Sequence, residues 1–305
     1  MSEKKTSNKK LFIKLFIIDS ILLILFAGGW FFSTTLMYPP PFTCQVDHFV
    51  NCGDPKSDFG IDFEEVEYKT KDDFKISAWY VPAKNDSGKS VISIHGRGAD
   101  RREGLRHVKA LHELGVNVIL PDLRNCGKSD KSFNSMTFHE RKDVDATFHF
   151  LKIQKKQNSI GILGFSMGGA TSILYMAENP EIKVGVFDSP FADFKRIITE
   201  NAKMMYSLPE FPLLSITVFL YEKRAEVEVE KMSPISVISS ISPRPILLFH
   251  GTDDKTVPYP HSKDLFEKAG EPKELITVEG GVHVELWQVD ERVRNKTVEY
   301  FSKYL

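Results

Sequence analysis

The sequence predicts an α/β domain with a mostly parallel central sheet and helices on both faces, preceded by one membrane-spanning helix. Two observations predict the sheet: short continuous apolar runs recur along the chain, and helical patterns separate them. A third observation predicts the membrane helix: residues 20–46 contain no charged side chain. The 305 residues permit one large domain or two, and the uninterrupted alternation without internal repeats favours one domain over residues 62–305.

Residues 15–37 are predicted to form a transmembrane signal-anchor helix, because this run is long and apolar enough to cross a hydrocarbon core of about 30 Å. Lysines precede the run at positions 4, 5, 9, 10 and 14, and the next charge after it is Asp47. The positive-inside rule therefore predicts that residues 1–14 are a cytoplasmic basic tail and that the catalytic part is extracytoplasmic. A cleaved signal peptide is the alternative, with Ala27 and Gly29 as small residues of a cleavage site.

An extracytoplasmic linker is predicted at residues 38–61, beginning with three consecutive prolines at positions 39–41. Cys44 and Cys52 lie close together in this linker, on the predicted oxidising side of the membrane. They either form a disulfide or remain two loop thiols. Cys126, after a predicted strand, is interpreted as a loop or packing thiol.

The strand pattern begins with an antiparallel hairpin at residues 66–69 and 74–81, whose turn is residues 71–73. Buried strands are then expected at residues 91–94, 116–120, 160–163, 184–187 and 246–249, and a last strand at residues 275–278. Leu105, Val108, Leu111 and Leu114 have helical spacing that ends at Gly115. A C-terminal helix is expected from the positions of Leu286, Val289, Val293 and Phe301. Residues 190–238 form a long insertion between two strands, which we interpret as a small helical lid.

A nucleophile elbow is predicted at Gly164-Phe165-Ser166-Met167-Gly168, because this segment follows a buried strand and precedes a helical stretch. The sharp turn strains the backbone at Ser166 and brings neighbouring chain too close for side chains at the two glycines. A bare pattern of this kind is weak evidence, but its place between strand and helix makes it specific. Ser166 is therefore the candidate nucleophile.

A serine hydroxyl needs a base and an orienting acid, and both types of residue follow later in the chain. Asp253 and Asp254 follow the strand at 246–249, and His283 follows Gly280-Gly281-Val282 after the strand at 275–278. Carboxyl ends of neighbouring parallel strands are where ligands gather. His283 is the candidate base, whereas His107, His112 and His139 are interpreted as ordinary helix or loop residues.

With these residues the chain resembles the α/β-hydrolase family over residues 62–305. The order of serine, acid and histidine, the strand followed by His95-Gly96, and the Gly-x-x-Asp-x-x-Val-Pro pattern that ends at Pro258 carry the resemblance. It implies Asp254 as the acid, which leaves Asp253 as a turn or capping residue and Asp188 as a weaker alternative acid.

The resemblance also implies an oxyanion hole formed by the backbone amides of Arg97 and Met167. The Arg97 guanidinium is interpreted as a solvated charge, with binding of an anionic substrate group as the alternative. The turn at residues 122–129 is taken as structural. Neither a metal nor an organic cofactor is implied.

Hydrolysis of a carboxylic ester is the first predicted activity, on a small-molecule or lipid-like substrate, because an apolar lid beside a membrane anchor suits acyl chains. A serine peptidase or amidase is the alternative, since the fold alone does not separate these reactions. A catalytically silent binding domain is the alternative of another class. The formal net charge of −1, without a clustered basic face on the domain, argues against nucleic acid. The oligomeric state is left open.

Overall fold

The computed structural model describes residues 2–44, 51–85 and 87–305. It divides into two compact units. The helical unit comprises Met1–Tyr38 and Ile198–Val227, and the sheet unit comprises Pro39–Ile197 and Glu228–Leu305. Each unit is described separately.

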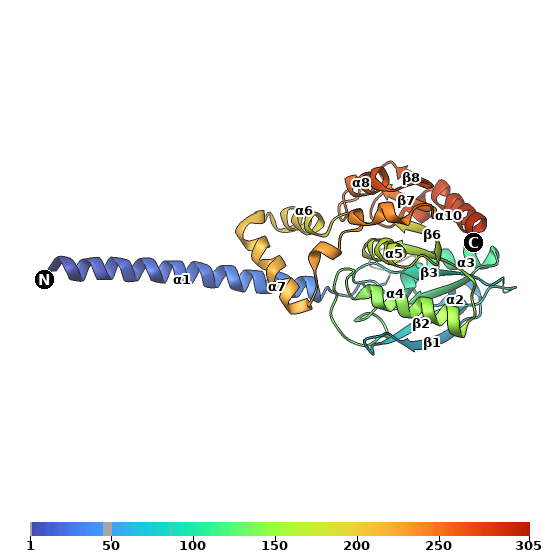
Figure 1. Ribbon diagram of the computed structural model, residues 1–305, viewed down its shortest axis with the longest axis horizontal. Coiled ribbons are helices and arrows are strands. Elements are labelled where there is room, and N and C mark those ends of the chain that lie inside the picture. The colour runs from blue at the N-terminus through green and yellow to red at the C-terminus, as the bar shows by residue number, and fades with distance from the viewer. Residues whose placement is uncertain (1, 45–50, 86) are drawn as a thin grey trace. The chain divides into compact units, whose positions relative to one another are not determined.

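The sheet unit contains one eight-stranded sheet in the order β1-β2-β4-β3-β5-β6-β7-β8 (Figure 1). Its strands are β1 (Glu64–Lys69), β2 (Lys75–Val81), β3 (Lys89–Ile94), β4 (Asn117–Pro121), β5 (Ser159–Phe165), β6 (Ile182–Asp188), β7 (Ile246–Gly251) and β8 (Lys273–Val278). β1 pairs antiparallel with β2, and β2 with β4, while every later pair is parallel. The predicted hairpin and the five predicted buried strands are confirmed, and so is the last strand at residues 275–278, although most residues of β8 are only half-buried.

Helices cover both faces of this sheet, because successive side chains of a buried strand point to opposite faces. Leu163 and Phe165 of β5 belong to the core shared with α3 and α10, whereas Ile162 points to the other face. The helices of the unit are α2 (Pro55–Phe59), α3 (Leu105–Glu113), α4 (Glu140–His149), α5 (Met167–Glu178), α8 (Pro260–Lys268), α9 (Leu286–Val289) and α10 (Glu291–Tyr304). The predicted α/β fold class is therefore confirmed.

The C-terminal helix differs from the prediction, because it is broken into α9 and α10 at Asp290. Asp290 is extended, with φ −127° and ψ 116°, and its carboxylate accepts a hydrogen bond from the Arg292 N–H at 2.8 Å. A short acidic side chain is more favourable at the N-cap of a helix than in a helix interior. The expected end of the earlier helix at Gly115 is confirmed, with φ +79° at that glycine.

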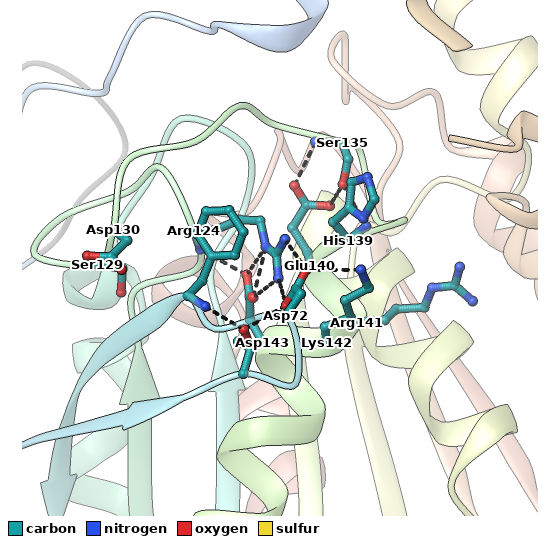
Figure 2. A network of polar contacts seen from close by, with 12 residues as sticks. Asp72, Arg124, Ser129, Asp130, Ser135, His139, Glu140, Arg141, Lys142 and Asp143 are labelled. Atoms are coloured by element: carbon teal, nitrogen blue, oxygen red, sulfur yellow. Dashed lines mark hydrogen bonds and ion pairs between the residues drawn. The ribbon is translucent and has the colours of Figure 1, made fainter. Parts of the chain in front are cut away.

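The loop between β4 and α4 is held by a buried ion-pair network (Figure 2). The Arg124 guanidinium donates to Asp143 at 2.7 and 2.9 Å and to Asp72 at 3.0 and 3.1 Å. Lys142 lies 2.9 Å from the same Asp72 carboxylate. Further along, the Asn134 amide contacts Met167 Sδ at 3.2 Å, so the braced loop reaches the start of α5.

The segment predicted as a helical lid is helical, with α6 (Phe194–Tyr206) and α7 (Ser215–Ala225) as its main elements. In the helical unit, α1 (Ser2–Met37) contacts α7. The part of α1 from Lys10 to Met37 is long and apolar enough to cross a membrane. A signal sequence has the same properties, so the choice between an anchor and a cleaved leader stays a prediction. In the linker the structure pairs Cys44 with Cys52 in a disulfide, the first of the two alternatives.

Candidate active site

Ser166 lies in the sharp turn between β5 and α5. Its φ is +50° and its ψ −117°, a strained combination for any residue other than glycine. A Cβ on Gly164 would lie 2.4 Å from the Gly168 carbonyl oxygen, and one on Gly168 would lie 2.3 Å from the Ile94 oxygen. Both glycines are therefore required by close approach of the backbone, as the sequence predicts. The turn holds the serine at the carboxyl end of the parallel sheet.

His283 and Asp254 meet where the neighbouring strands β8 and β7 end. The imidazole Nδ1 lies 2.6 Å from Asp254 Oδ2. The Asp254 side chain is fully buried, whereas that of His283 is 16% exposed. Two glycines permit the approach of the loops, since a Cβ on Gly251 would lie 2.1 Å from the Gly281 oxygen. A buried carboxylate in this position can fix the orientation of the imidazole and stabilise its protonated form.

The Asp254 carboxylate is also held by its own loop and by a second histidine. Its Oδ1 accepts hydrogen bonds from the amides of Thr256 and Val257, both at 2.8 Å. His250 Nε2 donates to the Val257 oxygen at 2.8 Å and lies 3.2 Å from Asp254 Oδ2. Sequence reasoning assigned no role to His250. The available signal was a histidine, fully buried in the structure, at the end of an otherwise apolar strand.

These contacts set the protonation state of Asp254. Burial by itself raises the pKa of this carboxyl, but hydrogen bonds and charge interactions with His250 and His283 outweigh burial and hold its pKa well below the ordinary range. Asp254 is therefore a carboxylate at neutral pH. A fixed negative charge beside Nδ1 leaves Nε2 as the ring nitrogen that can take up a proton.

The two candidate oxyanion donors lie on segments that pass beside each other. Met167 is the first residue of α5, where backbone amides have no acceptor within the helix. Arg97 follows Gly96 in the loop after β3, and a Cβ on Gly96 would lie 3.4 Å from Ser166 Cβ. This geometry brings the loop that carries Arg97 alongside the serine turn.

Three contacts brace the loop that carries Arg97. The Gly96 amide donates to Glu103 Oε2 at 2.6 Å, and His95 Nε2 accepts from the Leu123 amide at 3.0 Å. The Phe42 amide of the linker donates to the Gly98 oxygen at 2.8 Å. Gly98 has φ +79°, and a Cβ there would lie 2.9 Å from the Pro40 oxygen. The linker therefore supports this loop, a role that sequence reasoning missed because it joins residues far apart in the chain.

The alternative acids have different surroundings. Asp253 is exposed, and its amide donates to the Gly281 oxygen at 3.0 Å, which fits a turn residue. Asp188 is fully buried at the end of β6, and its Oδ1 accepts from the Ser189 hydroxyl at 2.9 Å. Burial raises the pKa of Asp188 to about 7, with nearby Arg106 opposing the shift. Among these carboxyls, Asp254 is the one for which the structure gives a contact with His283.

The remaining cysteine and histidines lie elsewhere. Burial raises the pKa of the Cys126 thiol, which suits a packing role better than a nucleophilic one. His107 is buried, with its ring centroid 4.1 Å from that of Trp287, and burial lowers its pKa well below the ordinary value. Within the described ranges, no cluster of three or more His, Cys, Asp or Glu side chains is placed to hold a metal ion.

Comparison with known proteins gives relatives over most of the chain. A family model described as the alpha/beta hydrolase fold matches residues 89–214. The Bacillus subtilis protein YqkD is 31% identical over 249 residues, covering 78% of this chain and 81% of that protein. The Escherichia coli K12 protein YfhR is 25% identical over 230 residues, covering 73% and 74% of the two chains.

Solved structures with the same fold include esterases. The Pyrococcus furiosus esterase Pf2001 is similar with a TM-score of 0.70 and 26% identity, covering 88% of this chain and 98% of that chain. Est1E from Butyrivibrio proteoclasticus, solved with ferulic acid bound, matches with a TM-score of 0.61 and 23% identity, covering 78% and 100%. The sheet order, the serine turn and these relatives together identify the chain as a member of the α/β-hydrolase superfamily, with a fold that supports hydrolase activity.

Proposed function

We propose that this protein is a membrane-anchored serine hydrolase that cleaves carboxylic esters through an acyl-enzyme. Ser166 is the nucleophile, His283 the general base and Asp254 the acid that orients the imidazole. The observation that carries the proposal is the 2.6 Å contact between His283 Nδ1 and the buried Asp254 carboxylate, in a fold whose strained serine turn lies at the same edge of the sheet. The likeness to an esterase from Pyrococcus furiosus supports the choice of ester over amide.

In the proposed reaction, the Ser166 hydroxyl attacks the ester carbonyl carbon and gives its proton to His283 Nε2. The negative charge on the carbonyl oxygen is stabilised by the backbone amides of Arg97 and Met167. The tetrahedral intermediate then expels the alcohol, which takes the proton from His283. Water hydrolyses the acyl-enzyme by the same steps, so that the acid is released and Ser166 regains its proton.

The proposed membrane topology assigns residues 1–14 to a cytoplasmic tail, 15–37 to the spanning helix and 38–61 to an extracytoplasmic linker. The hydrolase domain, residues 62–305 with a lid at 190–238, then lies outside. Five lysines before the span and the apolar length of α1 support this orientation. The Cys44–Cys52 disulfide supports it as well, since disulfides persist in oxidising compartments.

The test is hydrolysis of p-nitrophenyl esters, from acetate to palmitate, by the full-length protein in phosphatidylcholine nanodiscs. Ser166→Ala is expected to lower kcat/KM by roughly 10⁴- to 10⁶-fold, because the remaining groups cannot form the acyl-enzyme. The matched control is Ser240→Ala, an exposed serine of the same unit, which is expected to keep full activity. The acyl-length optimum then defines the substrate class.

A phosphonate probe separates the alternatives. Labelling of Ser166 without hydrolysis of any ester would favour a peptidase or amidase. No labelling of a folded protein would favour a silent binding domain. Ester hydrolysis that survives Ser166→Ala would overturn the assignment of the nucleophile.

A further inference from the structure

The insertion between β6 and β7 packs against the apolar N-terminal helix. In the helical unit, α7 and the turn before it lie along the C-terminal half of α1 (Figure 1). A Cβ on Gly28 would lie 2.9 Å from Leu213 Cδ1, and one on Gly29 would lie 2.6 Å from Ile216 Cγ2. Small residues that let helices approach this closely are typical of helix pairs inside membranes.

Arg224 fixes the level at which the two helices meet. Its guanidinium lies 3.8 Å from the centroid of the Trp30 ring and donates to Thr34 Oγ1 at 2.8 Å and to the Trp30 oxygen at 3.1 Å. A charged side chain with aromatic and hydroxyl partners suits the boundary between hydrocarbon and water. Leu213 meets Gly28 whereas Arg224 meets Thr34, so α7 runs in the same direction as α1.

The segment before Arg224, residues 204–221, exposes large apolar side chains. Glu210 is its only charged residue, whereas residues 222–226 contain four. Phe211 is the most exposed of the apolar side chains, at 77%. The others are Met204, Met205, Tyr206 and Phe219. This segment is called the apolar tip below. Exposed apolar patches of this kind mark interaction surfaces.

We propose that the apolar tip inserts into the bilayer beside α1, in the leaflet nearer to the hydrolase domain. The inference rests on the proposed anchoring of the protein by α1. With Arg224 and Thr34 at the boundary, Gly28 lies six residues deeper, which is roughly 9 Å along a helix. The tip around Leu213 reaches the same depth. Interfacial helices bury their apolar faces about 5–10 Å into the headgroup and acyl boundary.

The geometry favours a lipid occupant over a second copy of the chain. α6 and the segment Glu210–Ala225 are bent relative to each other by 119°, so the chain enters and leaves on one side of the bilayer instead of crossing it. The distribution of charged residues along α7 also fits this orientation. The charged residues 222–226 lie at the end of α7 nearer the boundary, and the apolar residues lie at the other end. The insertion is thus a second membrane contact beside α1, so that two segments hold the chain at the lipid surface.

Tryptophan fluorescence of the full-length protein in phosphatidylcholine liposomes tests the insertion. Phe211→Trp adds a probe to the apolar tip, and Met205→Trp adds a second, independent one. The matched control is Ile153→Trp, which replaces an apolar side chain in the sheet unit that is 70% exposed. Each spectrum is compared with that of the parent protein, whose own three tryptophans include Trp30 in α1. Lipids brominated on their acyl chains serve as the quencher.

The expected result is that brominated lipid removes most of the emission added at residue 211 or 205 and none of that added at residue 153. Added emission that resembles the control in wavelength and quenching would overturn the proposal. Blue-shifted emission without quenching would also overturn it, because a second protein copy would then cover the tip. Quenching of Trp30 in the parent reports on the anchor alone, and ester hydrolysis reports on the catalytic site. A failure of the insertion can therefore be distinguished from a failure of the anchor or of the proposed activity.

Discussion

Two buried aspartates of the sheet unit, Asp254 and Asp143, are each held by basic side chains, and these partners differ in chemistry. Asp254 lies in the loop between β7 and α8 and contacts His283 at 2.6 Å, and His283 is partly exposed. Asp143 lies in α4 and contacts Arg124 at 2.7 Å, and both of these side chains are almost completely buried (Figure 2). The carboxylates have similar contact distances but partners of different chemistry.

The partner decides what each carboxylate can do. Arginine stays protonated under all ordinary conditions, so the Arg124 pair can only hold chain segments together. Histidine changes its charge near neutral pH, so the Asp254 pair can assist proton transfer if the imidazole reaches a reacting group. Partial exposure of His283 gives a substrate that access. A buried carboxylate can therefore assist proton transfer only when its partner can change its charge and is at least partly exposed; otherwise the pair only holds chain segments together.

The largest expected effect is on the rate, in Asp254→Asn. The amide keeps the shape of the side chain but removes the charge that selects the imidazole tautomer, so kcat of the folded enzyme should fall by about 10⁴-fold, whatever the change in Tm. Ester hydrolysis and thermal unfolding of the same preparation measure both quantities. The neighbouring Asp253→Asn, at an exposed position, is the control and should behave as the parent. Equal losses in the two variants would contradict the assignment.

The next effect is on stability, in Asp143→Asn. Removing Asp143 as a charged partner leaves the buried Arg124 charge with Asp72 as its remaining ion-pair partner among the described residues, which should cost about 3–5 kcal/mol of unfolding free energy. Denaturant unfolding measures this, while kcat of the folded fraction should stay within a few-fold of the parent. Lys142→Met removes a half-buried cation from the edge of the same network and should cost less than about 1 kcal/mol. A loss of kcat as large as that of Asp254→Asn, without loss of stability, would reverse the comparison.

A smaller effect concerns Asp188, which lies at the same edge of the sheet as Asp254 but has a raised pKa. Burial raises its pKa to about 7, so the folded protein binds this proton more tightly than the unfolded chain. The favourable contribution is complete below the unfolded pKa, near 4, and is lost as pH rises to about 7. Relative to the parent, Asp188→Asn should therefore gain stability on the order of 2–4 kcal/mol between pH 4 and pH 8. Parallel unfolding curves for the two proteins across this range would show that Asp188 is ionised in the fold.

Most of the fold was predictable from the sequence because its signals are local. Apolar runs marked the parallel strands, and Gly164, Ser166 and Gly168 marked the turn between β5 and α5 through their spacing and their place between a buried strand and a helical stretch. The break at Asp290 was not predicted, because an acidic residue inside an amphipathic pattern is also typical of an exposed helix position. The hydrogen bond by which Asp290 caps α10 is evident only in the structure.

The surroundings of the candidate site were less predictable, even where the residues in contact are close in the chain, as His250 and Asp254 are. His250 beside Asp254, Glu103 beneath Gly96 and the linker contact at Gly98 depend on how the loops pack, not on spacing in the sequence. The choice between a disulfide and free thiols at Cys44 and Cys52 also depended on geometry.

The sequence by itself determined the residue types and their order, because strand periodicity, glycine positions and charge runs act over a few neighbouring residues. Only the tertiary structure decided which carboxylate contacts His283, which histidine braces it, and that the insertion packs on α1. These outcomes depend on burial and on how segments pack together, across separations from four residues, for His250 and Asp254, to 194, for Trp30 and Arg224. Such contacts arise from the folded arrangement of the chain, and they carry no signal at any single position of the sequence.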